Sequence, residues 1–312
     1  MAGSRSFVAE GVIPATLVAF DADFSIDIAE SRRHLRDVAK VDGVSAVTVN
    51  GHASEIHAFT LAEQQSLLAE SLAEVGDALP LVNGVYADGS DAAVTVARMA
   101  AAEGARALLV FPPNSMSMGG QLRPEMAVRH FQMIAEATDL PLILFQYPAA
   151  TGLGYPFATM LEIFDKVPSV VAIKDWCNDP MLHEKHIRTF QTLSRKVNVL
   201  STHSSWLMAS LSMQPAGLLS GAGSVIADLQ VQLFNAMKTH DLETARAVND
   251  RIYPLAQAFY AAPFLDMHNR MKACLVMLGR LERAVVRPPL IKLTDAELDS
   301  LRQALIAAGL LD

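Results

Sequence analysis

The chain has 312 residues, of which 51% are hydrophobic and 19% charged, with a formal net charge of −8 and a mean hydropathy of +0.26. This composition excludes disorder over most of the chain, and the acidic balance leaves no basic excess to hold a nucleic acid. No apolar run approaches the roughly 20 residues of a membrane span, so we expect no membrane partner. We attribute the apolar surplus to a thick core and to buried contacts between subunits.

The cysteines and the N-terminal sequence bear on the compartment. Cys177 and Cys274 are too few for a disulfide framework and form no CxxC pair. Residues 1–6 lack the charged-then-apolar pattern of a signal peptide. We therefore expect a cytoplasmic protein.

Eight short apolar runs, separated by helix-like stretches, predict eight β-strands. The runs cover residues 12–19, 44–49, 80–85, 106–111, 140–147, 169–174, 197–201 and 216–220. Strands that are apolar on both faces are typical of a parallel sheet covered on both sides. Eight such units in series favour a closed (β/α)8 barrel, the TIM barrel, over the alternative of an open doubly wound sheet.

The helix-like stretches include an amphipathic segment in which Thr60 and Glu63 have the spacing of a capping box. Towards the C-terminus the strand pattern stops and only helices are predicted. The predicted helices include 60–74 and 88–103 within the barrel, and 241–260, 264–279 and 294–308 after it. We therefore predict a barrel over residues 1–239, with C-terminal helices over 240–312 packed on it.

Active sites of TIM barrels form at the carboxyl ends of the strands, and Lys174 stands at such an end. A lysine that closes an apolar strand is poorly solvated. Poor solvation favours the neutral amine, which can attack a carbonyl to form a Schiff base. The alternative is a lysine whose ammonium group reaches from the strand end to water.

Aromatic residues follow the fifth and sixth strands. Phe145 and Tyr147 are two residues apart and face the same way on a continuing strand, and the phenol of Tyr147 could relay protons. Alternatively, Tyr147 packs beneath the proline turn that follows it. Beyond Lys174 we expect Trp176 to form a wall of the pocket and Cys177 to be a bystander.

Two loops of small residues could bring ligand close to the backbone. The first could hold a substrate carboxylate on its N–H groups, or could be an ordinary turn. The second is close to GxGxxA, reading GxGxxxA through Ala227, but further helix stands where the fingerprint needs a later strand with an acidic residue, so we expect it to shape the barrel mouth rather than bind a nucleotide. The residues concerned are Gly51, His52, Ala53 and Ser54 in the first loop and Ser220 and Gly221 in the second.

The histidines offer no persuasive set of metal ligands. His183 and His186 form HxxH on a predicted helix, and His52 and His57 lie near one loop, but neither pair has a third ligand at a suitable spacing. We interpret these pairs as surface histidines and predict no metal site. His203, at the end of the seventh strand, is expected near the barrel mouth as a contact for substrate.

These segments, in this order, resemble the dihydrodipicolinate synthase / N-acetylneuraminate lyase family over nearly the whole chain, from Gly11 to Leu311. The resemblance implies a class I Schiff-base lyase on a (β/α)8 barrel with C-terminal helices. It further implies no metal or organic cofactor and a homo-oligomer, usually a tetramer. The segments are Pro14–Asp21 (opening strand), Asn50–Glu55 (carboxylate loop), Ile173–Asp175 (Schiff-base lysine), Ser220–Gly223 (glycine loop), and Arg287–Leu290 with Ala308–Leu311 (tail).

The chain also departs from the family pattern. Phe145 stands where the family has its proton-relay tyrosine, so that hydroxyl is missing or comes from Tyr147. His52 and Ala53 stand where the family has two threonines, and Ala150 stands where synthases have an arginine. These differences argue against a true dihydrodipicolinate synthase and for a relative with another substrate.

We therefore expect an enzyme in which Lys174 condenses with the ketone of a 2-oxo acid, followed by aldol cleavage, condensation or dehydration. The substrate class is pyruvate-type, such as a 2-keto-3-deoxy sugar acid, and Tyr147 or a water moves the proton. Three alternatives remain. They are a dihydrodipicolinate synthase-like condensation, a metal-dependent barrel enzyme that uses His52, His57 and His203, and a non-catalytic ligand-binding barrel.

Overall fold

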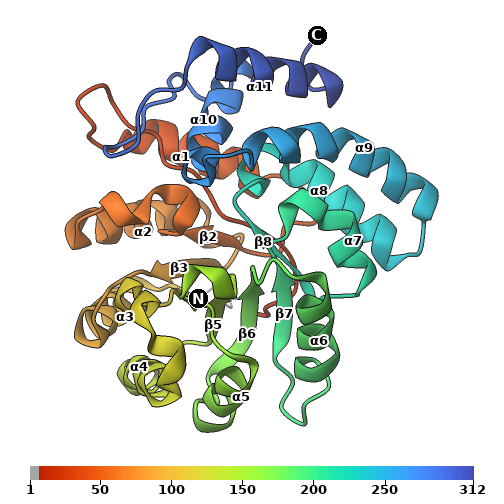
Figure 1. The fold of residues 1–312 in the computed structure, drawn as a ribbon. Helices are drawn as coiled ribbons and strands as arrows, with labels where there is room; N and C mark the ends of the chain where they lie inside the picture. Colours follow the sequence, from red (N-terminus) through yellow and green to blue (C-terminus); the bar gives the residue numbers. More distant parts are fainter. Residues whose placement is uncertain (1–6) are drawn as a thin grey trace.

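The computed structural model describes residues 7–312, in which eight parallel strands form a barrel surrounded by helices (Figure 1). The signal-peptide expectation concerns residues 1–6, which lie outside the described range. The strands are β1 (Gly11–Pro14), β2 (Val47–Val49), β3 (Leu81–Val85), β4 (Ala107–Val110), β5 (Leu142–Gln146), β6 (Val170–Asp175), β7 (Asn198–Ser201) and β8 (Gly217–Ser220). From β2 to β8 each strand pairs with the next in chain order, and β1 pairs with β8. Bridges from Val12 to Val44 and from Ala15 to Thr48 join the first two segments, so the predicted TIM barrel is confirmed.

The helices follow the strands and then continue alone, as predicted. Thr60 caps α2, and its reciprocal hydrogen bonds with Glu63 confirm the capping box. The helices are α1 (Ile28–Ala39), α2 (Leu61–Val75), α3 (Ser90–Glu103), α4 (Pro124–Ala137), α5 (Phe157–Lys166), α6 (Pro180–Phe190), α7 (Leu207–Ser212), α8 (Gly223–Lys238), α9 (Leu242–Phe259), α10 (Met267–Met277) and α11 (Asp295–Ala307). The division at 239/240 stays a prediction. It falls between the end of α8 and the start of α9.

The first strand is shorter than predicted, because Leu17 and Ala19 exchange the sheet ladder for side-chain acceptors. The N–H of Leu17 donates to the Ser224 hydroxyl, and the N–H of Ala19 donates to the Ser31 hydroxyl, each at 3.0 Å. These residues are nonetheless buried. The apolar run therefore predicted burial correctly, but it placed the end of the strand at residue 19 instead of Pro14.

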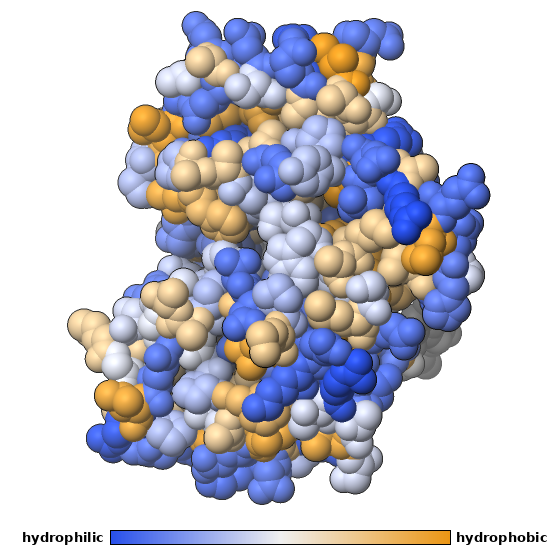
Figure 2. Space-filling model, turned by 45° about the vertical axis from the view of Figure 1, so that its right-hand side comes forward, coloured by the Kyte–Doolittle hydropathy of each residue, from blue (hydrophilic) through white to orange (hydrophobic). Residues whose placement is uncertain are grey.

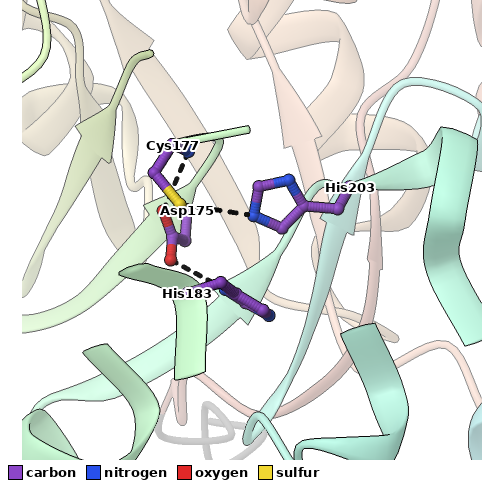
Figure 3. A group of neighbouring side chains, drawn as sticks. All are labelled: Asp175, Cys177, His183 and His203. Atoms are coloured by element: carbon purple, nitrogen blue, oxygen red, sulfur yellow. Dashed lines mark hydrogen bonds and ion pairs between the residues drawn. The ribbon is translucent and has the colours of Figure 1, made fainter. Parts of the chain in front are cut away.

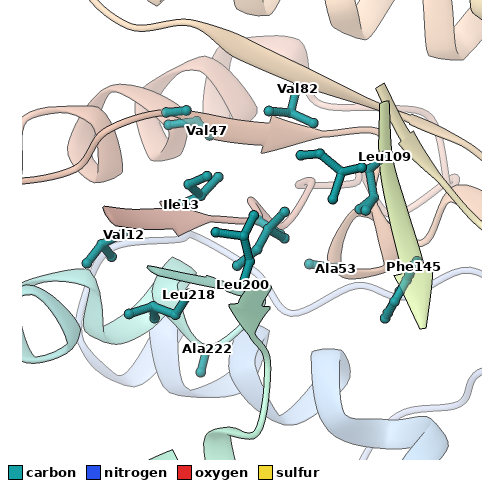
Figure 4. Close-up of a cluster of buried hydrophobic side chains, with 14 of the residues drawn as sticks. Val12, Ile13, Val47, Ala53, Val82, Leu109, Phe145, Leu200, Leu218 and Ala222 are labelled. Carbon is teal, nitrogen blue, oxygen red and sulfur yellow. The ribbon is translucent and has the colours of Figure 1, made fainter. Parts of the chain in front are cut away.

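The barrel core explains why the strands read as continuous apolar runs. Buried side chains from β1, β2, β4, β7 and β8 gather in one cluster, shown in Figure 4. Helices cover the outer face of the same strands, so both faces are dry. On the face shown in Figure 2, apolar residues are scattered among hydrophilic ones. Within residues 7–312, no helix is long and apolar enough to cross a membrane.

A buried ion pair fastens the C-terminal helices to the barrel. Lys272 of α10 and Glu55, in the loop after β2, are each 1% exposed, with Nζ 2.5 Å from Oε1. The Lys272 ammonium also donates to the Val285 carbonyl at 2.8 Å, and the other Glu55 oxygen accepts the N–H of Arg287 at 3.0 Å. The end of the loop between residues 50 and 55 is therefore held both by α10 and by the segment that follows it.

Gly84 in β3 provides a test of how tightly that loop is packed. A Cβ at this position would lie 1.9 Å from the carbonyl oxygen of Asn50. Because a backbone atom cannot move aside cheaply, we expect Gly84→Ala to lower the free energy of unfolding by about 1–3 kcal/mol or more, measured by urea denaturation. Gly89→Ala is the control, because a Cβ there meets nothing within 4 Å. Equal losses in the two variants would contradict this packing.

Candidate active site

A cavity of about 340 Å³ opens at the carboxyl ends of the strands. Its wall comes from β5 and β6, from the loops after β1, β2, β7 and β8, and from the segment that joins α9 to α10. The C-terminal helices thus complete a site that the barrel begins. Trp176 lies in the wall, where the sequence placed it.

Lys174 lies in this cavity and is only 5% exposed. On β6 it is the ladder partner of Phe145, and its Nζ lies 4.0 Å from the centroid of the Phe145 ring. In the part of the chain that the structure describes, no carboxylate pairs with it, whereas the other buried lysine, Lys272, has Glu55. Burial lowers the pKa of Lys174 from 10.5 to about 7. The amine is therefore substantially neutral near pH 7 and available as a nucleophile.

Phe145 and Tyr147 occupy different positions relative to the cavity. Phe145 forms part of its wall. Tyr147 is buried behind that wall, with its ring 4.5 Å from Phe145 and 5.2 Å from Trp176. Burial raises the pKa of the Tyr147 phenol above its ordinary value. The relay role of Tyr147 stays a prediction, and it requires a path from behind the wall.

The loop after β2 places in the cavity wall two residues whose backbone N–H groups have no acceptor within residues 7–312. His52 and Ala53 lie in the cavity wall, at the start of a short 3-10 turn. Within residues 7–312, the N–H groups of Ser54 and Glu55 bond to Gly51 and His52 carbonyls, while those of His52 and Ala53 have no acceptor. Two free donors side by side suit a carboxylate. Gly51 and Ser54 lie outside the cavity wall and close the turn through the bond from the Ser54 N–H to the Gly51 carbonyl.

Two histidines meet beside the lysine, and both stay neutral. The rings of His52 and His268 are 5.3 Å apart, and burial, together with Lys174, lowers the pKa of His52 to about 3. Burial and His52 likewise lower the pKa of His268 well below its ordinary value. Gly221 faces this pair, because a Cβ there would lie 3.1 Å from the His268 Nε2. Gly221 therefore leaves room for His268, which comes from α10.

The second loop reaches the cavity through a hydroxyl pair. The Ser220 hydroxyl is buried outside the wall and bonds at 2.8 Å to the hydroxyl of Ser204, which is in the wall. Tyr260, at the end of α9, also lines the cavity. Burial raises the pKa of its phenol, opposed by hydrogen bonds from Ser204, Ser220 and the N–H of Ala222. Sequence reasoning missed Tyr260 and His268, because nothing local links these helices to the barrel mouth.

The prediction that His183 and His186 are surface residues is wrong. Both rings are completely buried, and their Nδ1 atoms each lie 2.8 Å from the same oxygen of Asp175. With Ile187 and Phe190 they follow the i, i+3, i+4, i+7 spacing of a buried helix face, which was the signal available in the sequence. His203 lies in the cavity wall, as predicted, while His57 is exposed.

The comparisons with known proteins agree with this architecture. A model of the dihydrodipicolinate synthetase family matches residues 8–308. The chain is 29% identical over 303 residues to an uncharacterized DapA-like lyase of Halobacterium salinarum, covering 96% of this chain and 94% of the relative. It is 24% identical to the probable 2-dehydro-3-deoxy-D-pentonate aldolase YjhH of Escherichia coli, covering 96% and 98%.

Solved structures show the same fold. YagE of Escherichia coli K12, solved in complex with pyruvate, superposes with a TM-score of 0.89 at 21% identity, covering 97% of this chain and all of that one. A monomeric dihydrodipicolinate synthase variant also has a TM-score of 0.89, at 22% identity, covering 99% and 100%. The chain is thus a TIM-barrel enzyme of the lyase class. It belongs to the dihydrodipicolinate synthetase family, as its sequence indicated.

The lowered pKa of Lys174 predicts a pH-dependent cost to stability. The unfolded chain keeps the lysine proton up to about pH 10.5, while the native chain loses it above about 7. Between these pH values the unfolded state binds more protons, so the free energy of unfolding rises with pH. Below about pH 7 the native state carries the full cost of burying a charged amine. Lys174→Met removes the penalty, so we expect it to stabilise the protein more at pH 6 than at pH 9, by on the order of 1–3 kcal/mol. Urea unfolding at both pH values measures the difference, and a pH-independent gain would contradict it.

Proposed function

We propose that this lyase acts on a 2-oxo acid through a Schiff base on Lys174. The single observation that carries the proposal is a lysine amine that is buried, without a counter-ion, in the wall of the cavity at the barrel mouth. A desolvated amine is nucleophilic at neutral pH. The iminium that it forms is itself an electron sink, so the reaction needs no metal or organic cofactor.

The chemistry balances with Lys174 as the covalent group. Its neutral amine adds to the C2 carbonyl of the substrate, and loss of water gives the iminium. In aldol cleavage, a base takes the C4 hydroxyl proton, the C3–C4 bond breaks, C4 leaves as an aldehyde, and the electron pair of the broken bond moves into the iminium to give an enamine. Protonation at C3 and hydrolysis then release the shorter 2-oxo acid and return the free amine. In dehydration, loss of a C3 proton and of the C4 hydroxyl replaces the cleavage.

The free N–H groups of His52 and Ala53 support a position for the substrate carboxylate. Both residues share the cavity wall with Lys174, and Gly51 and Ser54 shape the turn that presents them. The neutral ring of His52 adds no competing charge. A carboxylate held here would face two N–H dipoles that the backbone holds in place and that lie in a site away from bulk water.

The remaining polar wall suits a hydroxylated substrate tail. Beyond the lysine, the cavity presents hydroxyl, amide and imidazole groups, supplied by Asn178, Thr202, His203, Ser204 and Ser205. Such groups match the hydroxyls of a 2-keto-3-deoxy sugar acid. The similarity to a probable pentonate aldolase and to a barrel solved with pyruvate supports the same class.

The alternative functions have less support. Ala150 supplies no guanidinium for a second carboxylate, against a dihydrodipicolinate synthase-like condensation. Among residues 7–312, the one group with metal-ligand geometry contains His203 but neither His52 nor His57, against the metal enzyme first considered. A non-catalytic binding barrel would share the cavity and lack turnover.

We further propose a homo-oligomer, a dimer or tetramer. Large apolar side chains are exposed between β4 and α4, where Met118 is 87% and Leu122 is 84% exposed. Side chains of this size are costly to leave in water, and burial against a second copy removes that cost.

Trapping tests the Schiff base directly. We expect incubation with pyruvate and sodium borohydride to add one reduced pyruvate per chain, located on Lys174 by peptide mapping and absent from Lys174→Ala. Lys272 is the internal control, because it is equally buried but paired with Glu55. An adduct on other lysines only, or none with pyruvate or any longer 2-oxo acid, would overturn the proposal.

Two phenol-to-phenyl changes separate the candidate proton relays. We expect Tyr260→Phe to lower kcat by about 100-fold or more while borohydride trapping persists, because the phenol that lines the cavity is lost. Tyr147→Phe should change kcat far less, because its ring lies behind Phe145. The opposite ranking would assign the relay to Tyr147.

A further inference from the structure

A second cluster of reactive side chains adjoins the cavity: His203 belongs to the wall, and the other three members lie outside it and take no part in the proposed chemistry. Asp175, Cys177, His183 and His203 each offer one ligand atom, and these atoms all lie within 4.8 Å of one another (Figure 3). All four residues are buried. They come from the end of β6 and the residues after it, from α6, and from the loop after β7.

The geometry points to a zinc site formed by Asp175, Cys177, His183 and His203. The thiolate, imidazole and carboxylate donors of such a set are those that Zn²⁺ takes in closed, four-coordinate sites. Bond lengths of about 2.0–2.3 Å in a tetrahedron place the donors roughly 3.3–3.6 Å apart. Here the Cys177 Sγ is 3.8 Å from the His203 Nε2, and the Asp175 Oδ2 is 2.8 Å from the His183 Nδ1. These two pairs need shifts of about half an ångström, and a separation at the 4.8 Å limit of the set must close by roughly 1.2–1.5 Å.

His203 makes no good hydrogen bond that would compete with a metal ion for its Nε2. Its ring stacks on Trp206 at 4.2 Å and meets His183 edge-on at 4.5 Å. Its Nδ1 is buried without a partner in the described part of the chain, and its Nε2 has only the long contact to Cys177. Packing thus fixes the ring with Nε2 aimed at the thiol, and an ion between them would supply the missing interaction.

The surrounding hydrogen bonds allow His183 to change its tautomer. Its Nε2 lies 2.8 Å from the Ser210 hydroxyl, which bonds to the Ser201 hydroxyl at 2.6 Å. Hydroxyls can donate or accept, so the ring proton can move to Nε2 and leave the Nδ1 lone pair for the metal. His186 would stay on the Asp175 carboxylate as the supporting partner that metal-bound carboxylates commonly have.

The charges balance when the ion binds. Zn²⁺ with one carboxylate and one thiolate is neutral, which matters because an uncompensated charge is costly at a buried site. Without metal, burial and Asp175 raise the pKa of the Cys177 thiol, whose proton is directed at the Asp179 carbonyl at 3.3 Å. Binding therefore displaces that thiol proton, which leaves to solvent.

Cobalt is the most specific probe of this set. Co²⁺ added to tag-free, chelator-treated protein should give a near-ultraviolet thiolate-to-cobalt band at one ion per chain, and Zn²⁺ should remove it. We expect Cys177→Ala to abolish the band and to weaken Zn²⁺ binding by about 100-fold or more, measured by competition with a chromophoric chelator. His203→Gln should also weaken binding strongly.

Cys274→Ala is the matched control, because Cys274 is the other buried free cysteine and lies in α10, outside the cluster. It should keep both the band and the affinity. Circular dichroism shows whether each variant is folded. A folded wild-type protein without a thiolate band, or a band that survives in Cys177→Ala, would overturn the site. Borohydride trapping on Lys174 is independent of either result, so this inference and the proposed function can fail separately.

Discussion

The alternation of side chains along β6 is the constraint on which the rest of the site depends. Successive residues of a strand point to opposite faces, so Lys174 and Asp175 are sent apart although they are adjacent in the chain. Lys174 enters the dry cavity at the barrel mouth, and Asp175 enters the layer between β6 and α6, where two histidines hold it. If the two side chains shared one face, the carboxylate would pair with the ammonium and hold it protonated.

The other walls of the cavity preserve this separation of charge. The Phe145 ring covers the amine, and His52 and His268 approach it as neutral rings. The buried carboxylate of the loop after β2, Glu55, is already neutralised by Lys272. A phenyl ring attracts a cation only weakly, and burial of the amine outweighs that attraction in setting its pKa. The cavity therefore offers polar groups to a substrate and no charge to the free lysine.

Much of this arrangement could be predicted from local patterns, and the exceptions have physical causes. All eight strands were predicted because buried parallel strands are apolar on both faces. Lys174 was found because a charged residue at the end of such a strand is conspicuous. Tyr260 and His268 were missed because packing of the C-terminal helices, rather than any local period, brings them to the barrel mouth. His183 and His186 were placed at the surface because their spacing was tested only for metal ligands, although the helix face that they share with Ile187 and Phe190 is apolar.

The central claim is that burial keeps the Lys174 amine neutral near pH 7, and its titration tests this most directly. Nuclear magnetic resonance of protein labelled at the lysine side chains, with Lys174→Met to assign the signal, would follow this one amine through the pH range. The account predicts a midpoint near 7. A midpoint near the ordinary value of 10.5 would show a solvated or paired ammonium and would contradict it.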